Sequence, residues 1–175
     1  MEVQRLDSIE ALLGEMMPDR IPFGVKGSDT QMITPPNIAK EMIDTLPDDI
    51  WNSDSTFLDP ICKSGIFLYE IYKKLMTSDS MITKFPDKKE RHFHIINNQL
   101  YGISPNKQCH LISIRTVYGQ IRENSNIISI KDYNHIMTNA DKQFLINTLK
   151  EKFRRVKFDV VIGNPPYNRG GTLTS

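Results

Sequence analysis

The amino-acid sequence predicts an α/β protein built on a parallel sheet that is covered on both faces. From residue 56 onward, short runs rich in β-branched and other apolar residues alternate with amphipathic stretches. This alternation is typical of sheets in which a helix connects each strand to the next parallel one. The strands are expected near 56–59, 99–104, 126–130 and 157–163.

The bulk composition is that of one ordinary globular domain. The 175 residues are 39% hydrophobic, and 22 basic and 21 acidic side chains give a formal net charge of +1. A nearly neutral chain offers no strong overall attraction to a polyanion such as nucleic acid. No stretch approaches the roughly 18 to 20 apolar residues that span a bilayer, and the acidic first residues are unlike a secretion signal. We therefore expect a cytoplasmic protein without a membrane contact.

Cysteine and histidine are too sparse to indicate a metal centre. Cys62 and Cys109 lie far apart in the sequence, each without a neighbouring cysteine. In a chain without a secretion signal, a disulfide between them is not expected. Only His92 and His94 are close in sequence among the four histidines. The sequence therefore predicts neither a disulfide nor a metal site.

Two helices are expected before the first strand. Residues 6–17 carry apolar side chains at helical spacing, and a loop containing proline and glycine follows them. Thr34 stands before two prolines and is predicted to cap the second helix, because proline suits the first helical turn. The spacing predicts that Ile38, Met42 and Leu46 form its buried face.

Three more helices are expected after the first three strands, the last near residues 140–153. Residues 78–98 interrupt the pattern and are predicted to be an insertion, partly charged loop and partly short helix. The predicted buried faces are, in chain order, Phe67, Leu68, Ile71, Tyr72 and Leu75; Leu111, Ile114, Val117 and Tyr118; and Phe144, Leu145, Leu149 and Phe153.

The strongest sign of chemistry is the segment Asn164-Pro165-Pro166-Tyr167, directly after the apolar run FDVVIG. It stands where a buried parallel strand should end and where open α/β sheets bind ligands. Because successive prolines fix the backbone, the side-chain oxygen of Asn164 and the carbonyl of Pro165 can be held as paired acceptors. Such acceptors suit the two hydrogens of an exocyclic amine, and Tyr167 offers a flat stacking surface. A rigid turn after a strand is the alternative interpretation.

The run FDVVIGNPPY resembles motif IV of amino-methyltransferases, which modify adenine, cytosine or occasionally a protein glutamine. Residues 57–67 (FLDPICKSGIF) resemble motif I, the strand, turn and helix that wrap the methionine part of S-adenosylmethionine. In motif I, Asp59 can pair with the amino group of the cofactor, and Gly65 allows close approach at a helix N-terminus. The usual pattern DPxCGSG has glycine at the position of Lys63. An ordinary strand-to-helix turn capped by Ser64 is the alternative.

Three further positions relate to the cofactor. The segment ITPP around Thr34 resembles the TP-containing motif that helps to hold it, although a plain helix start fits equally. Most relatives end the second strand with an acidic residue that holds the ribose, whereas this chain has Ser104, which before Pro105 could instead cap a helix. Asp132 matches the place of an aspartate against the cofactor's adenine amino group, or is a loop aspartate. The resemblance implies cofactor contacts at Thr34, Asp59, Pro60, Cys62, Gly65, Phe67, Ser104 and Asp132.

The order of these motifs resembles the catalytic part of adenine-specific methylases of restriction-modification systems. The resemblance implies a Rossmann-like methyltransferase fold and methyl transfer from S-adenosylmethionine to the exocyclic amino group of adenine in DNA. It implies catalytic roles for Asn164, Pro165, Pro166 and Tyr167 and requires no metal. DNA is the implied partner of the full-length protein, with a C-terminal target-recognition domain or a nuclease as further candidates.

The resemblance also sets expectations for domain organisation. We assign residues 1–32 to an N-terminal helix and loop and residues 33–175 to a methyltransferase domain. The chain ends eight residues after Tyr167, whereas the fold normally adds further strands and a recognition domain. The C-terminal strands are therefore expected to be missing, which would expose a strand edge and leave no DNA-reading element. We expect little or no methyl transfer by this polypeptide alone.

Three other functions stay open at this point. A non-catalytic methylase remnant would account for Lys63 and Ser104. A protein-glutamine methyltransferase would use the same NPPY motif, but such enzymes usually carry a helical substrate domain before motif I; an RNA-adenine target is the third possibility. Basic runs near 88–91 and 150–157 can either touch phosphate or form solvated faces.

Overall fold

The structure is a computed structural model of the chain. It describes residues 22–23, 31–120, 124–130, 133 and 142–164. The helix predicted over residues 6–17 lies outside this part of the chain.

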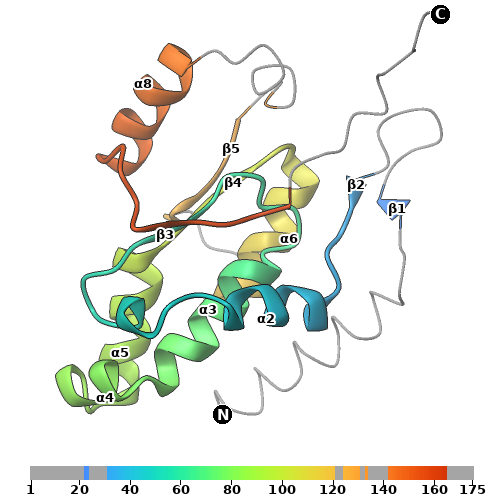
Figure 1. Ribbon diagram of the computed structural model, residues 1–175. Helices are drawn as coiled ribbons and strands as arrows, with labels where there is room; N and C mark the ends of the chain where they lie inside the picture. Colours follow the sequence, from blue (N-terminus) through green and yellow to red (C-terminus); the bar gives the residue numbers. More distant parts are fainter. Residues whose placement is uncertain (1–21, 24–30, 121–123, 131–132, 134–141, 165–175) are drawn as a thin grey trace, which may run out of the picture.

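A parallel sheet lies at the centre of the described structure (Figure 1). Its four strands stand in the order β5-β4-β3-β6. Leu58 of β3 pairs with Tyr101 of β4 on one side and with Val161 of β6 on the other. The α/β class, the parallel sheet and all four predicted strands are confirmed. The strand bounds are β3, Phe57–Asp59; β4, Leu100–Ser104; β5, Ile127–Ser129; and β6, Val160–Val161.

Two very short strands precede the sheet. β1 (Pro22–Phe23) and β2 (Gln31–Met32) pair antiparallel. The sequence predicts only loop here, because strands of two residues are too short to produce a recognisable alternation of apolar and polar side chains.

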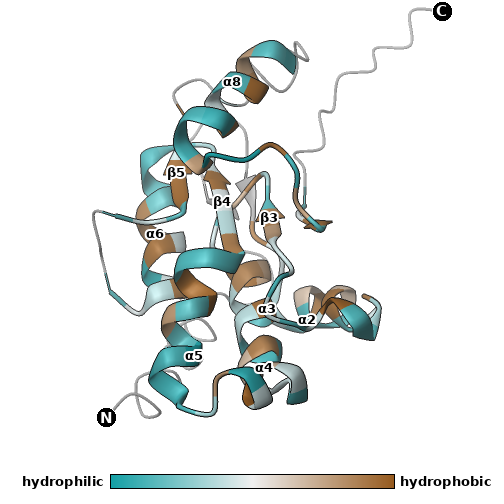
Figure 2. Cartoon of the chain, turned by 90° about the vertical axis from the view of Figure 1, so that its left-hand side faces the viewer, coloured by the Kyte–Doolittle hydropathy of each residue, from teal (hydrophilic) through white to brown (hydrophobic). Residues whose placement is uncertain are grey.

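Helices cover the two faces of the sheet unequally (Figure 1). On one face, α3 (Ile66–Thr77) lies between α2 (Pro36–Asp44) and α6 (Lys107–Tyr118). On the other face lies α8 (Lys142–Phe153). Because neighbouring strand residues point to opposite faces, Phe57 packs beneath α3 while Leu58 packs with α8. Figure 2 shows the strands and α3 largely in hydrophobic colours, whereas α8 is mostly hydrophilic.

The predicted buried faces are confirmed for α3 and are partly wrong for the other helices. In α3 all five predicted residues are buried. In α2 the buried residues are Ala39 and Ile43, whereas Ile38 and Met42 are 40% and 38% exposed. The buried stripe of α2 is thus rotated by one position from the predicted one. Leu111 of α6 and Phe144 of α8 are also exposed rather than buried.

The insertion after α3 is more helical than the sequence predicts. It folds into α4 (Asp79–Lys84), α5 (Lys88–His94) and a π-helical turn, η2 (Ile95–Gln99). The carboxylate of Asp87 caps α5 by accepting from the backbone N–H groups of Lys89 and Glu90 at 2.8 and 3.0 Å. Short capped helices of this kind carry too few apolar positions to show a helical period in the sequence.

Two arginines of the basic runs contribute to packing, whereas the lysines of these runs and Arg154 are exposed. Arg91 is 4% exposed and donates to the backbone oxygen of Phe85 at 2.6 Å. The guanidinium carbon of Arg155 lies 5.0 Å from the ring centre of Tyr101, within the range of a cation–π contact. These two arginines therefore hold the fold together, and neither is presented as a plain phosphate-binding side chain.

Within the described residues, no helix combines the length and the apolar character that crossing a bilayer requires.

A side-chain contact fixes the start of β6 beside the start of β3. The Asp159 carboxylate accepts from both the backbone N–H and the hydroxyl of Thr56, each at 2.8 Å, across 103 residues of sequence. The backbone N–H groups of Asp159 and Val160 donate in return to the carbonyl of Thr56 at 3.0 and 3.1 Å. The hydrogen bonds that the Asp159 carboxylate accepts from Thr56 lower the pKa of Asp159. These hydrogen bonds between Thr56 and Asp159 fix the register of β6 in addition to its backbone pairing with β3.

Replacing this carboxylate should weaken the fold measurably. Asp159→Ala is expected to lower the free energy of unfolding by about 1–2 kcal/mol, because the N–H group of Thr56 loses its acceptor in a buried position. Urea titration of the variant beside wild type measures the change. The matched control is Asp49→Ala, at an exposed aspartate, which should stay within about 0.5 kcal/mol of wild type. Equal stabilities of the two variants would show that the hydrogen bonds between Asp159 and Thr56 do not stabilise the fold.

Candidate active site

Five of the predicted functional residues converge at the carboxyl ends of β3 and β6. From β3 the chain proceeds through β4 to β5 on one side, and it then returns through α8 to β6 on the other side of β3. The connections after β3 and after β6 thus lie at a reversal of strand order, where open α/β sheets form a ligand-binding crevice. Asp59 is the last residue of β3, and Asn164 follows the end of β6.

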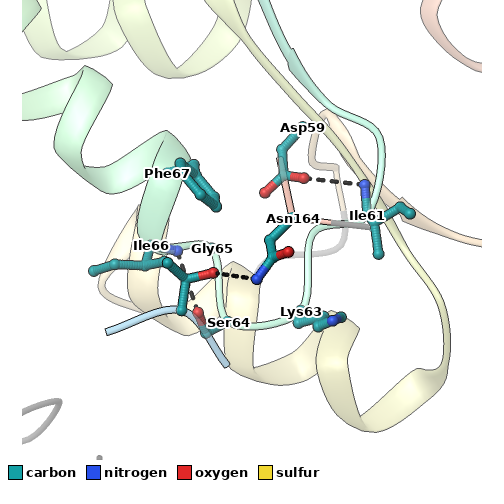
Figure 3. A pocket seen from close by; sticks show the side chains of 9 residues that line it. Asp59, Ile61, Lys63, Ser64, Gly65, Ile66, Phe67 and Asn164 are labelled. Atoms are coloured by element: carbon teal, nitrogen blue, oxygen red, sulfur yellow. Dashed lines mark hydrogen bonds between the residues drawn. The ribbon is translucent and has the colours of Figure 1, made fainter. Parts of the chain in front are cut away.

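A pocket that is partly open to solvent occupies this crevice (Figure 3). The space of about 220 Å³ within it includes open solvent, so the site is an open crevice rather than an enclosed cavity. Five predicted site residues meet in its wall. Its lining residues are Thr34, Asp59, Ile61, Lys63, Ser64, Gly65, Ile66, Phe67 and Asn164.

Gly65 shapes the loop between β3 and α3. Its φ of 80° lies in the left-handed region that favours glycine, and it directly precedes the first helical residue, Ile66. A Cβ atom at this position would lie 3.0 Å from the backbone oxygen of Ser113 in α6 and 3.1 Å from the Val117 side chain. The predicted need for glycine here therefore has a structural cause, which is the close packing of the loop on α6. Ser64 provides only a long contact of 3.4 Å to the N–H of Ile66.

Asp59 is a carboxylate buried in the pocket wall. It is 2% exposed, and it accepts from the backbone N–H of Ile61 at 3.0 Å and from the thiol of Cys62. Burial raises the pKa of Asp59 to about 7, against the opposing effects of these two hydrogen bonds and of the positive charge of Lys63. A carboxylate in this setting favours a cationic partner, because an adjacent positive charge would offset its lost hydration.

Lys63, where the usual motif has glycine, forms part of the same wall. Its side chain is only 9% exposed. Burial lowers the pKa of Lys63, while the neighbouring Cys109 and Asp59 act in the opposite direction. The departure from the motif therefore places a second ionisable group at the pocket beside Asp59, rather than a solvated surface lysine.

Cys62 and Ser104 belong to a buried polar network behind the pocket. The thiol of Cys62 is fully buried and hydrogen-bonds both Asp59 and Ser113, and burial raises its pKa. The hydroxyl of Ser104 is likewise fully buried and lies 3.1 Å from that of Ser113. Ser104 therefore does not line the pocket, and its predicted contact with a ribose has no support in this geometry. Neither does Ser104 cap α6: Asn106 does, by accepting from the N–H of Cys109 at 2.8 Å.

Asn164 reaches across the pocket to the start of α2. Its side-chain nitrogen Nδ2 donates to the hydroxyl of Thr34 at 3.2 Å. The preceding residue, Gly163, lies so close to Asp59 that a Cβ atom would approach the carboxylate oxygen Oδ1 to 2.7 Å and the ring of Pro60 to 3.3 Å. The end of the β6 segment is thus packed directly against the end of β3.

The predicted capping role of Thr34 is wrong. Pro35 occupies the N-cap position of α2, and no side chain accepts a hydrogen bond from the first turn of this helix there. Two successive prolines move the first helical residue to Pro36, beyond the reach of a threonine cap. The hydroxyl is used instead in the contact with Asn164.

Several predicted residues lie outside the described part of the chain: Asp132, Pro165, Pro166 and Tyr167. Tyr133, next to the first of these, is described and was not anticipated from the sequence. It is 1% exposed and packs with Leu58 and Ile61, and burial, together with the negative charge of Asp59, raises its pKa. A single aromatic residue in a polar segment gives no periodic signal, so this neighbour of the carboxylate could not be found from the pattern.

Fold and site together define a class. A parallel sheet with strands in the order third, second, first, fourth along the chain, and with a ligand crevice beside the first strand, is a Rossmann-like arrangement consistent with a methyltransferase fold.

Comparisons with known proteins agree with this class and make it more specific. Residues 98–175 match the family described as Eco57I restriction-modification methylase. The chain is also 27% identical over 200 aligned residues to an uncharacterized adenine-specific methylase of Mycoplasma pneumoniae, an alignment that covers 81% of the chain and 46% of that relative. The chain therefore spans about half the length of the curated relative it matches. The resemblance to adenine-specific DNA methyltransferases of restriction-modification systems, predicted from the motifs, is confirmed.

The buried Asp59 should make stability depend on pH. Its pKa of about 7 in the folded chain exceeds the ordinary value of roughly 4, so the folded state binds more protons between these values. The contribution of Asp59 to the free energy of unfolding should consequently fall as pH rises from about 4 to 7, by on the order of 1–4 kcal/mol, and then level off. Urea titration of wild type and Asp59→Asn at pH 5 and pH 8 isolates this group, because other titrations cancel in the difference. A pH-independent difference would show that the carboxylate is not perturbed.

Proposed function

We propose that this chain supplies the cofactor site and the catalytic motif of an enzyme that transfers a methyl group from S-adenosylmethionine to the exocyclic amino group of adenine in DNA, within a restriction-modification methylase. One observation carries the proposal: the carboxylate of Asp59 and the amide of Asn164 line one pocket at the strand-order reversal. The first is suited to an amino-acid cofactor and the second to a target amine.

The residues of the pocket fit the methionine part of the cofactor. The buried carboxylate of Asp59 would pair with the amino group, which replaces the hydration that burial removes. The first turn of α3 and the ammonium of Lys63 would favour the carboxylate group. Ile66 and Phe67 add apolar wall beside them. When bound, the cofactor would supply an electrophilic methyl group on a positively charged sulfur.

Asn164 would orient the target. Its side-chain oxygen, together with the carbonyl of Pro165, would accept both hydrogens of the amine and direct the nitrogen lone pair at the methyl carbon. The methyl group would pass from the cofactor's sulfur, which would keep the electron pair of the broken bond, to this nitrogen, and the proton that the nitrogen releases would go to water. Tyr167 would stack on a base turned out of the duplex. The scheme uses no metal and no covalent enzyme intermediate.

The proposal concerns the whole protein that contains this chain, because the curated relative is about twice as long as the matched part. DNA is its proposed substrate, and target recognition is assigned to a C-terminal domain or a partner. We also propose to divide the chain into residues 1–32 and 33–175, because the first of the motifs begins at Ile33. For the 175 residues alone, the expectation remains little or no methyl transfer.

Cofactor binding is the first test. Calorimetric titration with S-adenosylmethionine should show binding to wild type and at least about 30-fold weaker binding to Asp59→Ala, because the variant lacks the buried partner of the amino group. The matched control is Asp54→Ala, whose side chain is 88% exposed and precedes β3; it should bind as wild type does. Absence of binding to all three proteins would instead favour a non-catalytic methylase remnant.

Target choice is the second test. Labelled methyl groups should appear in unmethylated DNA rather than in RNA or a protein release factor, when the three are offered at equal concentration to the full-length protein. Asn164→Ala should reduce the rate by about 100-fold or more, since the amine loses an oriented acceptor. Label in RNA or in protein glutamine would overturn the DNA assignment. Robust turnover on DNA by the 175 residues alone would contradict the expected dependence on the rest of the protein.

A further inference from the structure

We infer that Thr34 is a positioning residue that fixes the direction in which the side-chain amide of Asn164 faces. The functional meaning of this contact rests on the proposed function, whereas the contact itself does not. It joins the segment before α2 to the segment after β6, 130 residues apart.

The geometry shows a directed contact. The Nδ2 atom of Asn164 donates to Oγ1 of Thr34 at 3.2 Å, and both residues line the pocket. Thr34 is 8% exposed, so water competes little for its hydroxyl. Figure 3 shows the Asn164 side chain between Asp59 and Ser64, with a dashed line leaving its nitrogen on the side away from Asp59.

Both backbones are restrained on the two sides of this contact. Thr34 precedes Pro35, whose φ is −58°, and a residue before proline is confined to extended conformations. Gly163 packs on the Asp59 carboxylate and on Pro60, which fixes the approach of Asn164. The backbone N–H of Ile162 also donates to the carbonyl of Leu58 at 2.9 Å. The hydroxyl and the amide therefore meet without a large loss of backbone freedom at either end.

Amide direction matters because the two ends of the group have opposite chemistry. The nitrogen carries two donors and the oxygen only acceptors. Because the nitrogen donates to Thr34, the oxygen faces the other way, where it can accept from a target amine. A reversed amide would present donors to an amine that also donates, and no hydrogen bond would form. By accepting from the nitrogen, the Thr34 hydroxyl holds the Asn164 side chain in the orientation that the structure shows, without itself contacting the reacting atoms.

The side-chain amide signals of Asn164 test this inference in the 175-residue chain without any activity. These signals, identified by their loss in Asn164→Ala, should shift in Thr34→Val, which keeps the shape and removes the hydroxyl, and should return in Thr34→Ser. Thr45→Val is the matched control, because the Thr45 hydroxyl bonds only to the nearby backbone oxygen of Met42 within the described contacts; it should leave them unchanged. Unchanged signals in Thr34→Val, or an equal shift in Thr45→Val, would overturn the inference.

A measurement on wild type covers the case in which Thr34→Val does not fold. One of the two Nδ2 protons should exchange with solvent at least about 5-fold more slowly than the other, as expected for a proton in a hydrogen bond worth roughly 1 kcal/mol. Equal exchange of both protons would overturn the inference as well.

A ligand titration separates this inference from the proposed function. With 2′-deoxyadenosine as the probe, the Asn164 signals of wild type should shift at concentrations at least about 5-fold lower than with purine 2′-deoxyriboside, which lacks the amino group. Thr34→Val should lose this preference and Thr34→Ser should keep it. If wild type shows no preference while its signals still depend on the Thr34 hydroxyl, the proposed target is wrong and the positioning role stands.

Discussion

The pairing of β6 alongside β3 is the constraint on which the rest of the site depends. It brings together two segments about 100 residues apart, through the Leu58–Val161 register and the bonds between Thr56 and Asp159. Without it, Asp59 and Asn164 would have no common pocket. The contacts of Gly163 with the Asp59 carboxylate and of Asn164 with Thr34 follow from this alignment.

The parallel sheet and its four strands could be predicted from the sequence because buried parallel strands leave continuous apolar runs separated by helical periods. α3 could be predicted in detail because it is buried on almost all sides. The faces of α2 and α6 could not be, since an exposed Met42 or Leu111 has the same apolar character as a buried one. Composition also concealed that Arg91 is an internal residue.

At the site, the motifs pointed to five residues that line one pocket in the structure: Thr34, Asp59, Gly65, Phe67 and Asn164. What they could not reveal is the partner of each side chain. Thr34 had an obvious local use as a helix cap, and only the tertiary fold offers it a more distant acceptor role. Ser104 likewise stood at the right strand end, but its hydroxyl turns inward to Ser113. Local pattern gives the position of a residue along the chain, whereas the direction of its side chain depends on neighbours that are remote in sequence.

The burial of Asp59 has a consequence for how the pocket exchanges protons. Because burial raises the pKa of Asp59 to about 7, part of the ligand-free molecules at neutral pH hold a proton on this carboxylate. A cationic ligand that binds to such a molecule displaces the proton. Part of the observed binding enthalpy is then the heat of ionising Asp59, and it depends on the buffer that takes up the proton. The pocket therefore behaves as an exchanger of one positive charge for another.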